Sequence, residues 1–159
     1  MIGTEPFVGH EDAVRPEWID RNGHMNLAYY LVVFDLGTDA LFDTLDIGIA
    51  YTTRSGNSMF VVETHTLYER ELREGERVAV ASRLIGVDAK RLHFAHEMLR
   101  RADGKRAASL EVLALHVDAR ARRAAPFPDA VRERLARAAA AHAGLARPRG
   151  VGRRIGLAE

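Results

Sequence analysis

A short polar segment before a predicted helix contains the residues best suited to chemistry in this chain. Asp20 lies in this segment, and Asn26 stands where the helix would begin. A carboxylate can activate water or attack a carbonyl carbon itself. The unpaired backbone N–H groups of the first helical turn, around Asn26 and Leu27, can stabilise the resulting oxyanion. Gly23 would let the backbone approach a substrate closely. The spacing therefore predicts a site for attack on an acyl group.

One carboxylate and one oxyanion site would be sufficient for a thioester. A thiol with a pKa near ~8.5 leaves far more readily than an alcohol, so no strong general acid is needed. The same residues also have a simpler interpretation, in which Asp20 caps a turn and Asn26 caps the helix. The residue types alone leave both interpretations open.

The elements that would position this segment follow from the hydrophobic periodicity. A long helix after Asn26 is expected from apolar residues spaced by three, four and seven, and its apolar circumference predicts burial on more than one side. Period-two patterns predict strands over 7–15, 58–71, 76–86, 91–101 and 106–117, the last four as a meander, and a helix over 127–142. Because 110–117 is apolar on both faces, a second subunit is expected to cover one of them. The prediction is an α+β fold.

Composition limits the remaining possibilities. The 159 residues fit one domain, and we expect it over 1–143 with a loose basic tail over 144–159. The absence of cysteine excludes disulfides, thiolate metal sites and a cysteine nucleophile. No signal-peptide pattern or long apolar run is visible, so a cytoplasmic location without membrane contact is expected. The net charge is only +1, and no aromatic residue interleaves the arginines after Phe127, so nucleic acid is not an expected partner.

The segment from Pro16 to Tyr30 resembles the signature of hotdog-fold thioesterases of the 4-hydroxybenzoyl-CoA thioesterase-like group. The shared pattern is an aspartate, then Gly-His-Met-Asn, then a tyrosine at the start of the central helix. The run from Glu63 to Gly75 resembles the second strand and turn of that group, and the resemblance covers about residues 7–130. Within the group, the betainyl-CoA thioesterases of carnitine breakdown are most alike. They share the signature, the strand around 62–65 and the turn over 88–93.

The resemblance implies a hotdog fold, with a long central helix wrapped by a five-stranded antiparallel sheet and followed by a C-terminal helix. It implies hydrolysis of a small acyl-CoA, with betainyl-CoA as the expected substrate. Asp20 would be the general base or the nucleophile, and the N–H groups around Asn26 and Leu27 the oxyanion site. Homodimers or homotetramers with shared active sites are expected. No cofactor is expected beyond the coenzyme A of the substrate.

Several residues are candidates for binding that substrate. Trp18, Tyr30 and Tyr68 could present aromatic faces to a trimethylammonium group, although each could equally be a core residue. Glu63 and His65 lie two apart on a predicted strand and share one face with Met59, Val61 and Leu67. On this otherwise apolar row they form either a mutually hydrogen-bonded structural pair or part of the acyl pocket, where Glu63 could face the trimethylammonium group. The other candidates are His24, which could orient the substrate, and three basic residues near turns that could contact CoA phosphates or only solvent, Arg54, Lys90 and Arg91.

The same residues leave two other functions open and bear on a possible metal site. A hotdog module could bind acyl-CoA without catalysis, although an intact Asp20 argues against it. A hotdog enoyl-CoA hydratase or dehydratase would need an Asp/His pair on a different element, which the chain lacks. His93 and His96 are three apart on a strand and face opposite ways, so we expect no metal.

Overall fold

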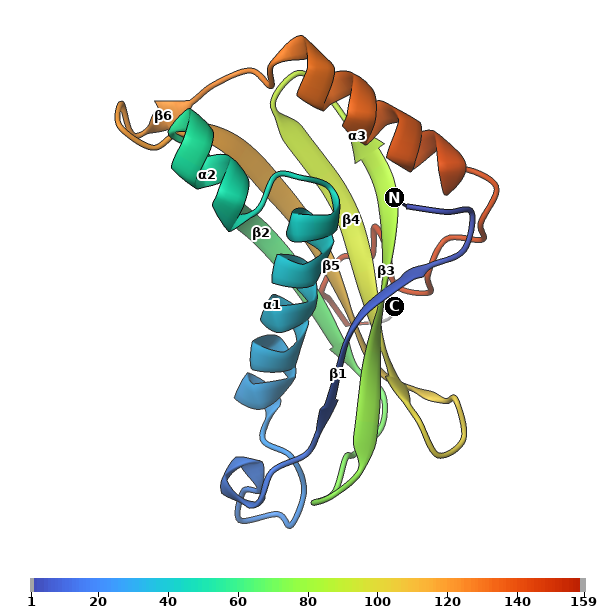
Figure 1. Ribbon diagram of the computed structural model, residues 1–159. Helices are drawn as coiled ribbons and strands as arrows, with labels where there is room; N and C mark the ends of the chain where they lie inside the picture. The colour runs from blue at the N-terminus through green and yellow to red at the C-terminus, as the bar shows by residue number, and fades with distance from the viewer. Residues whose placement is uncertain (1, 158–159) are drawn as a thin grey trace.

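An antiparallel sheet curves around one long helix in the computed structural model, which describes residues 2–157 (Figure 1). The helices are α1 (Leu27–Thr44), α2 (Ile49–Ser55) and α3 (Asp129–Ala141). The strands are β1 (Phe7–Ala13), β2 (Asn57–Tyr68), β3 (Arg77–Val87), β4 (Arg91–Arg100), β5 (Arg106–Asp118) and the short β6 (Arg123–Ala124). The predicted α+β class is confirmed.

The strand order differs from the predicted meander. It runs β1-β3-β4-β5-β2, with β6 beside β5, so only β3, β4 and β5 follow one another as hairpins. Tight turns at Asp88 and Asp103 fix those hairpins, whereas the irregular chain between β2 and β3 lets β2 pair with β5 at the far side. This leaves β2 as an edge strand. The stretch 49–55, for which the sequence analysis predicted no element, forms α2.

Helix α1 begins where the sequence predicted. The Oδ1 of Asn26 accepts a hydrogen bond from the Ala28 N–H at 3.0 Å, which is an N-cap. One side of α1 packs into the core through fully buried residues such as Phe34 and Leu41. The expected burial on a second side is not found in the single protomer. Four apolar residues of that side are between 38% and 60% exposed: Leu27, Leu31, Val32 and Leu36.

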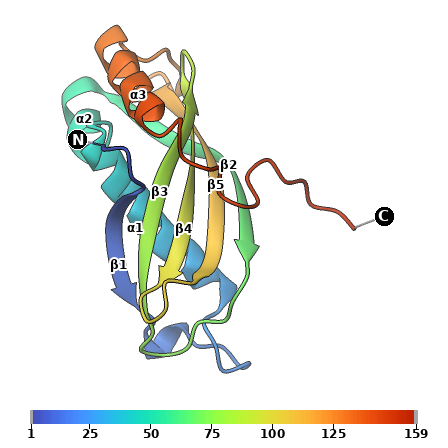
Figure 2. The ribbon, with the colours of Figure 1, turned by 90° about the vertical axis from the view of Figure 1, so that its right-hand side faces the viewer.

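The chain after α3 crosses the sheet on the face opposite α1 (Figure 2). We call residues 145–157 the C-terminal segment. Gly150 adopts φ +100° and lies against Leu67, where a Cβ atom would be 2.2 Å from Cδ1, so only glycine fits. The Gly152 N–H donates to Glu111 Oε2 at 2.7 Å. The segment was expected to be a loose tail, yet it packs on the face of β5 for which a second subunit was the expected cover.

Some expectations about the ends of the chain are outside the structure. Residue 1 of the predicted domain and residues 158–159 of the predicted tail lie outside the described residues. Within 2–157, no helix combines the length and the apolar character needed to cross a bilayer. The expected cytoplasmic location stays a prediction.

Candidate active site

The loop that carries Asp20 is closed by its own backbone. Ile19 and Met25 form a β-bridge, the Asp20 N–H donates to His24 O at 3.0 Å, and the Gly23 N–H donates to Asp20 O at 3.0 Å. Gly23 has φ +80°, a conformation that residues with a Cβ atom rarely adopt. The loop therefore holds the Asp20 backbone in one place, and Gly23 serves the turn.

The Asp20 carboxylate both caps this turn and faces a cavity. Its Oδ1 accepts from the Asn22 N–H at 2.7 Å. Its Oδ2 has no hydrogen-bond partner among residues 2–157, and the side chain lines a cavity of about 380 Å³. The two interpretations of the sequence are thus compatible, because one oxygen orients the carboxylate and the other stays available to a water molecule or a substrate.

One backbone amide at the start of α1 remains available as an oxyanion donor. The Asn26 N–H donates to Trp18 O at 2.9 Å, the Ala28 N–H donates to Asn26 Oδ1, and the Tyr29 N–H donates to Asn26 O at 3.0 Å. The Leu27 N–H has no acceptor within the described chain, and Leu27 lines the cavity. The expectation that both Asn26 and Leu27 supply donors is corrected, since the Asn26 amide is already bonded.

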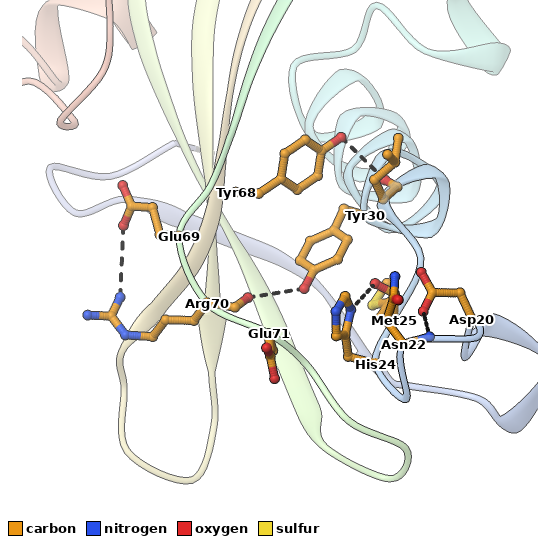
Figure 3. Close-up of a pocket in the computed structure, with 10 residues that line it drawn as sticks. Asp20, Asn22, His24, Met25, Tyr30, Tyr68, Glu69, Arg70 and Glu71 are labelled. Atoms are coloured by element: carbon orange, nitrogen blue, oxygen red, sulfur yellow. Dashed lines mark hydrogen bonds and ion pairs between the residues drawn. The ribbon is translucent and has the colours of Figure 1, made fainter.

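The end of β2 is tied to this loop and helix by three hydrogen bonds. The Met25 N–H donates to Leu72 O at 2.7 Å, the Tyr30 hydroxyl donates to Arg70 O at 3.1 Å, and the Tyr68 hydroxyl donates to Leu27 O at 3.3 Å. The rings of Tyr30 and Tyr68 meet edge-on, with centroids 5.3 Å apart (Figure 3). Both tyrosines line the same cavity as Asp20, Tyr68 as an exposed ring and Tyr30 as the buried ring that supports it.

Both tyrosines keep their protons near neutral pH. Burial, opposed by a backbone hydrogen bond at Leu72 and aided by the charges of Glu71 and Glu76, raises the pKa of Tyr30 to about 12. Burial also raises the pKa of Tyr68, against a hydrogen bond from Thr66. Each hydroxyl is therefore a hydrogen-bond donor here, and neither is a candidate base.

The cavity contains residues that the sequence did not single out. They are Asn22, Met25, Glu69, Arg70 and Glu71. Asn22 and Met25 could have been inferred from their place in the signature loop. The other three follow β2, and only the strand order brings them to the helix N-terminus. Both Glu69 oxygens bond the Arg106 guanidinium, at 3.1 and 2.7 Å, whereas Glu71 is exposed and forms no ion pair within residues 2–157.

Glu63 and His65 lie outside this cavity. The pairing of β2 with β5 shifts register between Val61 and Glu63, so the residues before and after this bulge face opposite sides of the sheet. Val61 faces a groove beside α1, whereas Glu63 and His65 line a separate cavity of about 420 Å³ on the other face, with His93 and Glu111. The predicted apolar row is broken, and their placement in the acyl pocket is corrected.

The remaining candidates divide between the loop and the opposite end of the protomer. His24 lines the Asp20 cavity, and its Nδ1 lies 3.4 Å from Met25 O. Trp18 is 5% exposed and stacks on Tyr29 with centroids 5.5 Å apart, so it supports the loop from the core. Arg54 pairs with Asp46 at 2.5 Å, and Arg91 pairs with Asp88 at 2.5 Å.

The predicted CoA-phosphate residues are therefore distant from the cavity within one protomer. Arg54 ends α2, and Lys90 and Arg91 lie in the β3–β4 turn. Both features are at the end of the molecule opposite the Asp20 loop (Figure 1). No group of three or more His, Cys, Asp or Glu side chains in the described part of the chain is arranged to hold a metal ion. The expectation of no metal stays a prediction.

The fold and this site define a family. The model of the Thioesterase-like superfamily matches residues 14–135, and the chain belongs to that superfamily. A Staphylococcus aureus protein solved in complex with CoA is 25% identical and superposes with a TM-score of 0.87, covering 99% of this chain and 98% of that one. The predicted hotdog thioesterase fold is confirmed.

Two relatives are informative about the kind of thioesterase. The chain is 42% identical over 154 residues to betainyl-CoA thioesterase of Pseudomonas aeruginosa, with 97% of both chains covered. It is 36% identical to part of the L-carnitine dehydrogenase/betainyl-CoA thioesterase of Rhizobium meliloti, and there it spans 90% of its own length and 29% of that longer protein. The predicted resemblance to betainyl-CoA thioesterases, and with it the class of thioester hydrolase, is confirmed.

Proposed function

We propose that this chain hydrolyses the thioester of a small cationic acyl-CoA, with betainyl-CoA as the substrate, to the free acid and CoA. The observation that carries the proposal is the juxtaposition in one cavity of the Asp20 carboxylate, the Leu27 amide and two tyrosine rings. The identity to betainyl-CoA thioesterase supports the same substrate. The reaction needs no cofactor beyond the CoA that the substrate carries.

The residues of the cavity divide the reaction between them. Asp20 Oδ2 takes a proton from water while the water oxygen attacks the carbonyl carbon, or Oδ2 attacks that carbon and forms a mixed anhydride that water then opens. The Leu27 N–H donates to the carbonyl oxygen as negative charge develops there. The C–S bond breaks and the CoA thiolate leaves. It takes up the proton that Asp20 removed from water or, in the anhydride route, a proton of the water that opens the anhydride. His24 lies beside this path and orients the acyl group.

A cationic acyl group suits the walls of this cavity. Tyr68 is 46% exposed and presents its ring, whereas Tyr30 is a core residue that supports Tyr68 edge-on. An ammonium group is attracted to an aromatic face by about 0.5–2 kcal/mol. Glu71 adds an unpaired carboxylate to the same cavity. Glu71 thus takes the role that the sequence suggested for Glu63.

Thiol release from matched thioesters tests the proposal. Betainyl-CoA and 3,3-dimethylbutyryl-CoA have the same shape and differ by one positive charge. We expect the cationic ester to be turned over faster, and Glu71→Gln to reduce that preference. Equal rates for the two esters would refute the cationic pocket.

A wider panel of thioesters tests the reaction itself. Thiol release only from hydroxybenzoyl, aliphatic or long-chain esters would show that the substrate is one of these and not betainyl-CoA. Tight CoA binding without release from any ester would support a non-catalytic module, and turnover of enoyl-CoA would indicate a hydratase.

A homodimer built on β2 fits the exposed apolar surface. Phe60, Val61 and Val62 on this edge strand are 45% to 53% exposed, beside the exposed apolar side of α1. An unpaired edge of that length is normally covered, because its free N–H and C=O groups otherwise attract other strands. Two copies pairing through β2 would cover both surfaces, and two such dimers would give a tetramer. A cytoplasmic location, where CoA esters are available, belongs to the same proposal.

A further inference from the structure

We propose that the C-terminal segment is part of the substrate site and that Arg149 and Arg153, together with Arg70, bind the phosphates of CoA. This inference rests on the proposed function, and it adds the subsite for the nucleotide end of the substrate. The residues matched by the superfamily model end at 135, before this segment begins.

The C-terminal segment is held against the sheet at three points. Pro148 is buried, Gly150 closes on Leu67 and Ser109, and the Gly152 N–H bonds Glu111 Oε2 at 2.7 Å. Arg149 and Arg153 flank the two glycines of this contact. Their backbone positions are therefore set by packing, while both side chains remain exposed.

These arginines line a polar cavity of about 580 Å³ with Leu67, Tyr68, Glu69 and Arg70. The cavity carries an excess of positive charge. Glu69 is its acidic side chain; both of its oxygens bond Arg106, and its Oε2 lies 3.9 Å from Arg70 Nη1, so one carboxylate faces two guanidinium groups. Neither Arg149 nor Arg153 forms an ion pair with any residue in 2–157. Residues 143–157 contain four arginines and no acidic residue. Planar guanidinium groups without carboxylate partners are suited to phosphate oxygens, which they bind in bidentate fashion.

The polar cavity adjoins the candidate active site. Tyr68, Glu69 and Arg70 line both cavities. Tyr68 lies on the helix side of β2, whereas the side chains of Glu69 and Arg70 extend to the other side of the strand (Figure 3). The end of β2 thus separates a thioester site from a phosphate site, and a flexible pantetheine arm is the part of CoA that would pass from one to the other.

Paired substrates test the phosphate site directly. Arg149→Gln/Arg153→Gln should raise KM for an acyl-CoA by at least about tenfold, the scale of one charge-assisted hydrogen bond, and leave kcat unchanged. The same acyl group on N-acetylcysteamine, which has no phosphate, should give unchanged constants. The matched control, Arg120→Gln/Arg132→Gln, removes two exposed charges elsewhere and should affect neither substrate. Equal losses on both esters, an unchanged KM for acyl-CoA, or the same loss in the control would overturn the proposal.

A binding measurement separates this inference from the proposed activity. Adenosine 3′,5′-bisphosphate carries phosphates of CoA and no thioester, so its calorimetric binding does not depend on turnover. We expect the double variant to bind it at least about tenfold more weakly than the wild-type protein and the matched control do. A further outcome is that the wild-type protein hydrolyses no ester while the double variant still binds the bisphosphate at least about tenfold more weakly than wild type does. That result would support the phosphate site and refute the hydrolase function. Equal affinity in all three proteins would refute the phosphate site.

Discussion

Replacement of Leu27 by proline removes one backbone N–H and leaves the geometry of α1 intact. Proline is favoured at the first position of a helix, where it has no intrahelical bond to lose. The residue before it must be extended, and Asn26 already has φ −64° and ψ 143°. The stability of Leu27→Pro should therefore stay within about 1 kcal/mol of the wild type.

The effect on catalysis should be large, because no other amide of the first turn can replace this donor. The Asn26, Ala28 and Tyr29 N–H groups are all bonded. Loss of one oxyanion donor costs about 10²–10³ in kcat, or roughly 2.7–4 kcal/mol. Leu27→Ala, which removes the side chain and keeps the N–H, should retain most of the turnover.

Steady-state thiol release from the preferred acyl-CoA measures this effect, and thermal unfolding reports the fold. The proline ring occupies the position of the amide hydrogen, so obstruction of the cavity is the competing explanation. Obstruction would raise KM at nearly constant kcat, whereas a lost donor lowers kcat. A folded Leu27→Pro protein with kcat within about threefold of wild type would refute the oxyanion assignment.

Three further changes test the carboxylate, the edge strand and the core. Asp20→Asn keeps an oxygen for the Asn22 N–H and should fold normally while turnover falls by about 10²–10⁴; near-normal thiol release would remove Asp20 from the mechanism. Val62→Lys should convert a dimer into monomers in sedimentation equilibrium, whereas Val8→Lys on the exposed edge strand β1 should not; an unchanged Val62→Lys dimer would exclude β2 as the interface. Burial lowers the pKa of His96 to about 3, so the folded state favours the neutral ring. The contribution of His96 to the free energy of unfolding should be fully present above pH ~6.5 and decrease by about 1.4 kcal/mol per pH unit from there down to about pH 3. In urea unfolding His96→Gln should flatten that slope; an unaltered slope would contradict the assignment.

Local signals in the sequence predicted the elements and the catalytic loop. The helix was placed correctly because Asn26 is an N-cap whose side chain bonds the next turn, which is a contact between neighbours in sequence. Asp20 was proposed from its place a few residues before that helix and from the resemblance to the thioesterase signature, and its catalytic role stays a prediction. The hairpins of β3, β4 and β5 depend on short turns and were also predictable.

The order of the strands depends on contacts between distant residues, and here the sequence was insufficient. The patterns predicted β2 and β3 as neighbours in a meander, but β2 pairs with β5 instead. The pairing of β2 with β5 brings Arg70 and Leu72 to the signature loop, where their carbonyl oxygens accept hydrogen bonds from the Tyr30 hydroxyl and the Met25 N–H. The same pairing brings Glu71 to the candidate site, and no periodicity in the sequence indicates that position.

The bulge in β2 determines which carboxylate belongs to the active site. Strict alternation from Val61 places Glu63 on the side of the sheet that faces α1. One extra residue in the strand reverses that assignment for everything after it. The reversal moves Glu63 and His65 to the face that the C-terminal segment crosses, and it leaves Tyr68 on the helix side beside Tyr30. A single insertion in one strand therefore puts Glu63 and His65 on the face of the sheet with the arginines, and leaves Tyr68 on the face of the proposed acyl site. Glu71, which follows the strand, is then the carboxylate available to a cationic acyl group.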